Sequence, residues 1–226
     1  MTSPPVAATH RVFKVYGSTG HRTTALNDVS VEAGAGELVL LLGPSGSGKT
    51  TLLTVIAGLE KPTTGDVTLF GKNVADYAPS QLQKLRAGNI GFVFQTFHLI
   101  DALTVLDNVL LVTRFNRQPR RAAKERALGL LTRFGVEGLA GAYPHTLSQG
   151  EKQRVAVARA LVNEARLVIA DEPTASLASQ QGFEIVRLLR AFATDENRCV
   201  VVASHDERIA EFSDRVLRLG DGTLVS

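Results

Sequence analysis

The sequence is short of the residues that mark disulfide-rich, zinc-binding and membrane-spanning proteins. It contains one cysteine, Cys199, one methionine and no tryptophan in 226 residues. A single cysteine excludes an internal disulfide and a cysteine-based zinc site, so we expect Cys199 to be a core residue of a cytosolic protein. No stretch approaches the roughly 18 consecutive apolar residues that a membrane-spanning helix needs, so any role at a membrane has to run through a partner.

The chain also lacks a strong excess of either charge. It carries 25 Lys and Arg against 22 Asp and Glu, a net charge of +3, and it has no basic stripe interleaved with aromatic residues. We therefore expect no nucleic-acid partner. With 44% hydrophobic and 21% charged residues, the composition is that of a folded globular protein. Residues 1–9 have no apolar signal core and predict a flexible tail before a single domain over 10–226.

The strongest pattern in the chain lies at 38–52. An apolar run from Leu38 to Leu42 is followed by GPSGSGKT at 43–50, which fits the phosphate-loop pattern G-x-x-x-x-G-K-[ST]. Glycines let backbone N–H groups point at a phosphate, Lys49 supplies a charge for the β- and γ-phosphates, and the Thr50 hydroxyl can ligate Mg²⁺. A helix starting near Thr50 adds the positive end of its dipole. The stretch therefore predicts nucleotide binding.

The rest of the chain alternates between strand-like and helix-like segments. Apolar and β-branched runs predict strands at 12–16, 25–31, 66–70, 89–95, 166–170 and 199–203 and a closing hairpin at 214–219 and 223–225. Helical patterns occupy 50–57, 79–87, 104–114, 121–134 and 181–193, with a further helix after Ser148. We predict an α/β fold with a core over about 10–95 and 155–226 and a helical subdomain inserted at about 96–154.

Polar residues follow several of the predicted strands. Asp171 and Glu172 close one apolar strand, Gln95 closes another, and His205 comes just after a third. In a parallel α/β sheet, ligands bind at the carboxyl ends of the strands. Taken singly, such residues are ordinary surface groups. Beside a phosphate loop, however, Asp171 is suited to holding Mg²⁺ through its water shell and Glu172 to orienting or deprotonating a water. The Gln95 amide could reach Mg²⁺ or the attacking water.

Three other features of the sequence each allow two interpretations. Tyr16 is either an edge-strand packing residue or a platform for an adenine ring. Ser148 and Glu151 form a capping box, which begins either an ordinary helix or a second phosphate-binding helix N-terminus. The basic residues between Arg114 and Arg126 form either a solvated face or a surface that meets a membrane partner or lipid headgroups.

Together these segments resemble the ATP-binding subunit of ABC transporters, from about residue 10 to residue 226. The phosphate loop is 43–50, and Tyr16 matches the adenine-stacking aromatic residue. Further matches are the Q-loop at Gln95, the signature motif at 147–151, Walker B with its catalytic glutamate at 166–172, and the switch histidine at His205. The resemblance implies a P-loop NTPase core of the RecA-like type, with an N-terminal antiparallel β subdomain and an inserted α-helical subdomain. Stretches such as TLLTVIAGLEKPTTGDVTLFG look like the MacB/LolD/FtsE group.

The resemblance also implies a site that binds ATP and Mg²⁺ between two copies arranged head to tail. Its catalytic residues are Glu172, His205, Gln95 and Lys49, and its metal-binding residues are Thr50, Gln95 and Asp171. The implied nucleotide-binding set is Tyr16, Gly43, Pro44, Ser45, Gly46, Ser47, Gly48, Lys49, Thr50, Thr51, Ser148, Gln149 and Gly150.

The implied role is an ATPase on the cytoplasmic face of the cell membrane, bound to an integral-membrane permease of the MacB, LolCE or FtsX kind. Export or extraction from the membrane is the favoured direction. A regulatory ATPase whose membrane partner moves no substrate and an importer subunit are the alternatives. A soluble ATPase acting on DNA or ribosomes is disfavoured, because those usually carry long coiled coils, zinc modules or a tandem second domain.

The sequence departs from the family pattern at three positions. In the signature motif, Gln149 replaces a glycine and Glu151 replaces a glutamine, while Ser148 and Gly150 are retained. Ala178 stands where the family has an aspartate that makes contacts across the dimer. Whether the two sites stay fully coupled and symmetric is therefore open, whereas hydrolysis itself is expected to be retained because Glu172 and His205 are present.

Overall fold

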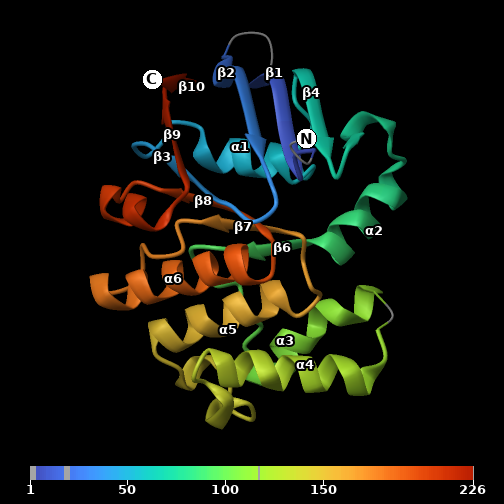
Figure 1. Ribbon diagram of the computed structural model, residues 1–226, viewed down its shortest axis with the longest axis vertical. Coiled ribbons are helices and arrows are strands. Elements are labelled where there is room, and N and C mark those ends of the chain that lie inside the picture. The colour runs from blue at the N-terminus through green and yellow to red at the C-terminus, as the bar shows by residue number, and fades with distance from the viewer. Residues whose placement is uncertain (1–3, 18–20, 117, 226) are drawn as a thin grey trace.

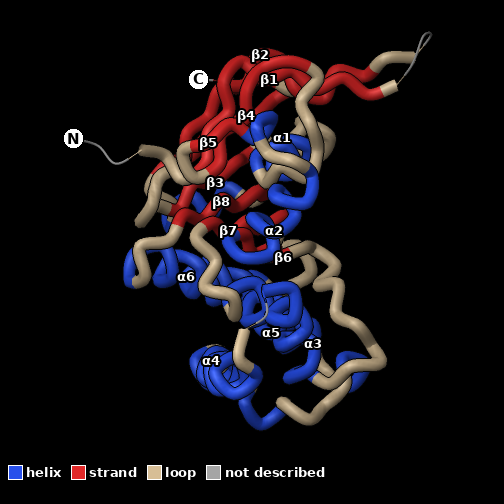
Figure 2. The backbone as a smooth tube through the Cα atoms, turned by 90° about the vertical axis from the view of Figure 1, so that its right-hand side faces the viewer, coloured by secondary structure: helices blue, strands red, loops and turns tan. Residues whose placement is uncertain are grey.

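The computed structural model describes residues 4–17, 21–116 and 118–225 and contains two β-sheets with helices packed around them (Figures 1 and 2). The smaller sheet is antiparallel, with strand order β2-β1-β4-β5. Its strands are β1 (Ala7–Tyr16), β2 (Thr23–Ala33), β4 (Thr64–Leu69) and β5 (Lys72–Asn73). The N-terminal antiparallel β subdomain is therefore present as predicted.

The larger sheet carries the expected core, with strand order β10-β9-β3-β8-β7-β6. Its strands are β3 (Leu38–Leu42), β6 (Ile90–Val93), β7 (Leu167–Asp171), β8 (Cys199–Ser204), β9 (Arg215–Gly220) and β10 (Thr223–Val225). The pairs from β9 to β6 are parallel, and β10 adds an antiparallel edge. The α/β fold class predicted from the sequence is confirmed.

Two apolar cores lie on opposite faces of this sheet, because successive side chains of a strand point to opposite sides. Leu38, Leu40 and Leu42 of β3 face the helices α5 (Gln149–Leu161) and α6 (Ser179–Asp195). Val39 and Leu41 face α1 (Lys49–Ile56) and the smaller sheet. Cys199 is fully buried, and this burial raises the pKa of its thiol to about 12, as suits the core role predicted for it.

The remaining helices form the inserted lobe at the bottom of Figure 1 and its connection to the core. They are α2 (Pro79–Asn89), α3 (Val105–Leu111) and α4 (Arg120–Arg133). The predicted helix over 104–114 is shorter than expected and continues as a 3₁₀ turn over Val112–Asn116. Helix α5 runs through the subdomain boundary drawn at 154 and 155, because its apolar face packs against both the lobe and the large sheet.

The N-terminal tail is shorter than predicted. Residues 7–9 belong to β1, where Ala7 pairs with Ala33 of β2 and with Leu69 of β4, and Val6 is buried. The small and polar residues at 7–9 do not form a strand-like pattern in the sequence. They form a strand because their backbone groups pair with strands on both sides. Residues 1–3 of the predicted tail lie outside the described residues.

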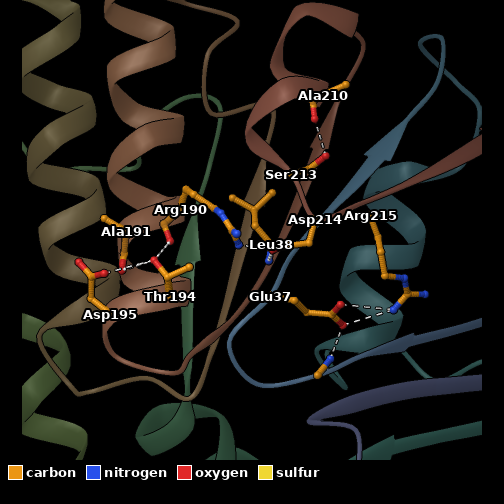
Figure 3. Close-up of polar contacts among 11 residues, drawn as sticks. Glu37, Leu38, Arg190, Ala191, Thr194, Asp195, Ala210, Ser213, Asp214 and Arg215 are labelled. Atoms are coloured by element: carbon orange, nitrogen blue, oxygen red, sulfur yellow. Dashed lines mark hydrogen bonds and ion pairs between the residues drawn. The ribbon is translucent and has the colours of Figure 1, made fainter.

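Charged residues fix the start of β3, at the end of the strand opposite the phosphate loop (Figure 3). Asp214 accepts a hydrogen bond from the Leu38 N–H at 2.8 Å and also pairs with Arg190 of α6. Glu37 pairs with Arg215 of β9 at 3.3 Å. These contacts tie α6 and β9 to β3 and so fix the strand that delivers the phosphate loop. Within the described residues, no helix combines the length and apolarity needed to cross a membrane.

Candidate functional site

The phosphate loop turns sharply between β3 and α1, and only glycine fits at two of its positions. A Cβ atom at Gly43 would lie 2.2 Å from the Leu219 carbonyl oxygen, and one at Gly48, whose φ is +101°, would lie 2.4 Å from the Ala25 oxygen. Gly46 also has a positive φ, +82°, but no atom of the described residues lies within 4 Å of a Cβ built there. The loop is therefore packed tightly on its protein side and open at Gly46, which leaves room for a phosphate to approach the backbone.

Lys49 lies inside this loop and is 6% exposed. Its Nζ donates to the carbonyl oxygens of Gly43 at 2.8 Å and Pro44 at 3.0 Å. The hydroxyl of Ser47 is also buried and has no hydrogen-bond partner among the described residues. A buried cation beside an unpaired hydroxyl fits an anionic ligand, as the phosphate-loop motif predicts.

Asp171 and Thr50 meet at the carboxyl end of β7. The Thr50 hydroxyl donates to Asp171 Oδ2 at 2.8 Å, whereas the buried Oδ1 has no partner among the described residues. Burial raises the pKa of Asp171, an effect that the Thr50 hydrogen bond partly opposes. A carboxylate with an unused oxygen next to a hydroxyl is a donor set that suits Mg²⁺. Two of the three residues predicted to hold the metal, Thr50 and Asp171, are thus brought together.

Glu172 is placed between the phosphate loop and His205. Its Oε1 lies 3.6 Å from Lys49 Nζ, and its Oε2 shares a 2.9 Å hydrogen bond with His205 Nδ1. The residue has a φ of +47°, an uncommon conformation for a side chain other than glycine. Its N–H is anchored at 2.9 Å on the Ala203 carbonyl of β8. The strained backbone therefore aims the carboxylate at the loop, and the predicted base and switch histidine are in direct contact.

Gln95 and Tyr16 lie farther from this cluster of contacts. Gln95 is exposed just after β6, and its carbonyl accepts a hydrogen bond from the Ser176 hydroxyl at 3.4 Å. None of the described hydrogen bonds joins its side chain to Asp171, Thr50 or Glu172. Tyr16 is 39% exposed and its hydroxyl donates to Glu60 at 2.6 Å. Burial and this bond raise the pKa of Tyr16. The roles of Gln95 and of Tyr16 as an adenine platform remain predictions.

The signature segment begins α5 as the capping box predicted. Glu151 Oε2 accepts from both the Ser148 N–H, at 2.8 Å, and its hydroxyl, at 2.7 Å. Both bonds lower the pKa of Glu151, and the bond from the Ser148 hydroxyl has the larger effect. Helix α5 packs in the core on one face of the large sheet and α1 in the core on the other (Figure 1). None of the described hydrogen bonds or ion pairs joins 148–150 to the phosphate loop of the same chain.

Ala178 is the N-cap of α6, with a φ of −61° and a ψ of 145° and without a side-chain cap. Replacing it by aspartate supplies the missing cap, so Ala178→Asp is expected to stabilise the fold by about 1 kcal/mol and raise the Tm by roughly 2–4 °C. We also expect a higher ATPase rate or a higher Hill coefficient, because the family places an acid here across its dimer. Ala178→Ser is the matched control that caps the helix without an acid. An unchanged rate and Hill coefficient in Ala178→Asp would show that the alanine is neutral for coupling.

Two buried polar residues of α5 were missed by the sequence analysis. Arg159, 9% exposed, donates to the carbonyls of Phe97 and His98 at 2.6 and 2.5 Å, and so fixes the segment after Gln95. Gln153, 1% exposed, donates to the carbonyl of Pro173 at 2.8 Å. The only available signal was that each lies on the helix face otherwise occupied by Val155, Ala156 and Ala160.

A comparison with known families places this architecture in a defined class of ATPase. The family model described as ABC transporter matches residues 26–175. The cassette of MJ0796, solved as a dimer in a post-hydrolysis state with ADP and Pi, superposes with a TM-score of 0.90 at 38% identity over 97% of both chains. The chain therefore belongs to the ABC transporter family and is an ATP-binding subunit that hydrolyses ATP.

The relatives narrow the class to the MacB-like group. The chain is 39% identical over 94% of its length to the putative hemin import ATP-binding protein HrtA of Staphylococcus epidermidis, of which it covers 96%. It is 38% identical over its whole length to the macrolide export ATP-binding/permease protein MacB 1/2 of Paracoccus denitrificans. It spans 34% of that longer relative. The resemblance to the MacB-like group drawn from the sequence is confirmed.

Proposed function

We propose that this chain drives a membrane permease of the MacB, LolCE or FtsX kind, in export or in extraction from the membrane, from the cytoplasmic face. The observation that carries the ATPase part is the line of contacts from Lys49 through Glu172 to His205. That line places a carboxylate next to the cation of the phosphate loop, where an attacking water has to be activated.

In the proposed mechanism, the backbone of the phosphate loop and Lys49 bind the β- and γ-phosphates of the substrate ATP. Thr50 and Asp171 would hold Mg²⁺, which supplies positive charge against the phosphates when it is bound. Glu172 orients the water and takes its proton, while His205 holds the carboxylate at Oε2 and contacts the γ-phosphate. Gln95, on its exposed turn after β6, is assigned to the same water and metal.

The position of the signature segment supports a second copy of the chain in the working assembly. Helices α5 and α1 lie on opposite faces of one sheet, and none of the described hydrogen bonds or ion pairs joins 148–150 to the phosphate loop of the same chain. A second chain placed head to tail can bring its α5 N-terminus to the exposed side of the triphosphate, where the positive dipole end and the Ser148 hydroxyl suit the γ-phosphate. ATP then holds the pair together, and hydrolysis releases it.

We assign one groove to the permease. It lies between four elements: α2, β6, α5 and the 3₁₀ turn that follows α3. It has a volume of about 400 Å³, and its lining includes the apolar side chains of Phe92, Leu111 and Phe115 and the charged side chain of Arg86. Phe115 is 66% exposed, so a partner that covers it would bury a large apolar side chain. The groove is lined in part by Phe94 and His98, which lie on either side of Gln95 in the chain, so a permease segment seated there lies close to the turn that carries Gln95.

Binding to native membranes stripped of peripheral proteins tests the permease assignment. We expect saturable binding that protease treatment of the membranes abolishes. Phe115→Asp should weaken it by about ten-fold or more, because a buried aromatic side chain contributes about 1.5–3 kcal/mol. Leu128→Asp, at the exposed Leu128 of α4 outside the groove, is the control and should bind normally. Equal binding to protein-free lipid vesicles would contradict the proposal.

Import is the second candidate direction, because the HrtA relatives are named for hemin import. Inside-out vesicles that carry the permease distinguish the two directions. ATP-driven accumulation of the cargo inside such vesicles supports export, and ATP-driven release from them supports import. A partner that moves no cargo in either direction supports the regulatory alternative.

A further inference from the structure

Gln153 joins the signature helix to the turn that carries the catalytic glutamate. It lies in the second turn of α5, is 1% exposed, and its Nε2 donates to the Pro173 carbonyl at 2.8 Å. Pro173 directly follows Glu172, whose own N–H is held by the Ala203 carbonyl of β8. The strained backbone of Glu172 is therefore fixed by the sheet on one side and by α5 on the other.

This side chain is costly for the fold. Its Oε1 is buried and has no hydrogen-bond partner among the described residues. A buried polar atom without a partner is destabilising, whereas a methionine of similar length would fill the space without that penalty. Methionine would, however, leave the buried Pro173 carbonyl without its donor, so the two effects on stability oppose each other. What the glutamine provides and methionine cannot is the bond to Pro173.

The parts that Gln153 connects are packed with little free space. A Cβ at Gly150, in the first turn of α5, would lie 3.1 Å from Gln181 Oε1 of α6. A Cβ at Gly182 would lie 3.1 Å from Thr174 Cβ, in the turn after Glu172. The first turns of α5 and α6 and the turn at 173–178 thus form one close-packed unit, which we call the signature unit. A displacement of the α5 N-terminus therefore acts on the turn after Glu172 through the bond of Gln153 to Pro173 and through these contacts.

We propose that Gln153 is a positioning residue that couples the α5 N-terminus of one chain to the catalytic glutamate of the same chain. The inference rests on the proposed head-to-tail dimer. When α5 closes on the nucleotide held by the partner, Gln153 carries that movement through the Pro173 carbonyl to Glu172. Glu172 then reaches its working position only after the other site has filled.

The test compares steady-state ATPase kinetics, ATP binding and melting temperature in full-length variants. Gln153→Met removes the donor, and we expect kcat to fall by about ten-fold while KM, ATP affinity and ATP-dependent pairing stay within two-fold of wild type, since one hydrogen bond is at stake. Its Tm should stay close to that of wild type, because the loss of the unpaired Oε1 and the loss of the donor to the Pro173 carbonyl have opposite effects on stability. Arg154→Met is the matched control: the neighbouring Arg154 bonds to Phe134 and Glu184 but not to the turn at 173–178, so its kcat should be unchanged.

Gln153→His tests for rescue, because its ring places an N–H donor at a similar distance from the backbone. We expect it to recover most of the kcat lost in Gln153→Met. Three outcomes would each overturn the positioning role. They are a wild-type kcat in Gln153→Met, equal losses of kcat in Gln153→Met and Gln153→His, and a loss of ATP affinity instead of kcat. Failure of the dimer proposal is distinguishable, because the wild-type chain would then bind ATP without pairing.

Discussion

Glu172→Gln is expected to keep ATP binding and to lose turnover. The amide preserves the size of the side chain but cannot accept the proton of the attacking water, so kcat should fall by about 10²–10⁴-fold, the usual contribution of a general base. Calorimetry should find the affinity for Mg·ATP unchanged or increased, because the carboxylate 3.6 Å from Lys49 Nζ no longer competes with the γ-phosphate for that cation. The ATPase rate and the ATP affinity are measured on the same preparation.

Glu207→Gln is the control for this prediction. Glu207 pairs with Arg218 on the surface, and its side chain is 72% exposed, so its neutralisation should leave kcat and affinity as they are. An ATPase rate like that of wild type in Glu172→Gln would remove Glu172 from the chemistry. The mechanism would then need another base.

Lys49→Ala is expected to abolish ATP binding. The substitution removes a buried cation whose three donors are positioned inside the loop, and charge-assisted hydrogen bonds of this kind contribute about 1.5–3 kcal/mol each. Losing two of them lowers the affinity by about 100-fold or more. Isothermal calorimetry with Mg·ATP measures the loss, and circular dichroism confirms that the variant is folded.

Lys124→Ala, on the exposed face of α4, is the matched control and should bind ATP normally. Unchanged affinity in Lys49→Ala would contradict the assignment of the phosphate loop. The contacts of Lys49 with the Gly43 and Pro44 carbonyls would then have a purely structural role.

The sequence could predict the fold and most of the site because both follow from local patterns. The phosphate-loop glycines, the apolar strands and the capping box of Ser148 with Glu151 each carry their own geometric requirement. Polar residues that end parallel strands had to meet at one edge of the sheet, and the contacts of Asp171 with Thr50 and of Glu172 with His205 follow that rule.

Other features depend on contacts between distant segments, which no local pattern encodes. The start of β1 at Ala7 needed the pairing with both neighbouring strands to be known. The positive φ of Glu172 and the bond of Gln153 to Pro173 appear only when β7, β8 and α5 are assembled. Ala178 was noted as a departure from a family pattern. That it is the N-cap of α6, and makes no side-chain capping bond there, could be seen only once the start of the helix was known.

The central claim is that each ATP lies between the phosphate loop of one chain and the signature segment of another. It is tested most directly by mixing two variants, each also carrying Glu172→Gln to block turnover. One carries Lys49→Ala and the other Ser148→Arg, at the exposed Ser148. Sedimentation with Mg·ATP should find each variant alone to be monomeric. The mixture should form a pair that retains ATP at its one intact site. A mixture that stays monomeric while the Glu172→Gln chain pairs would contradict the claim.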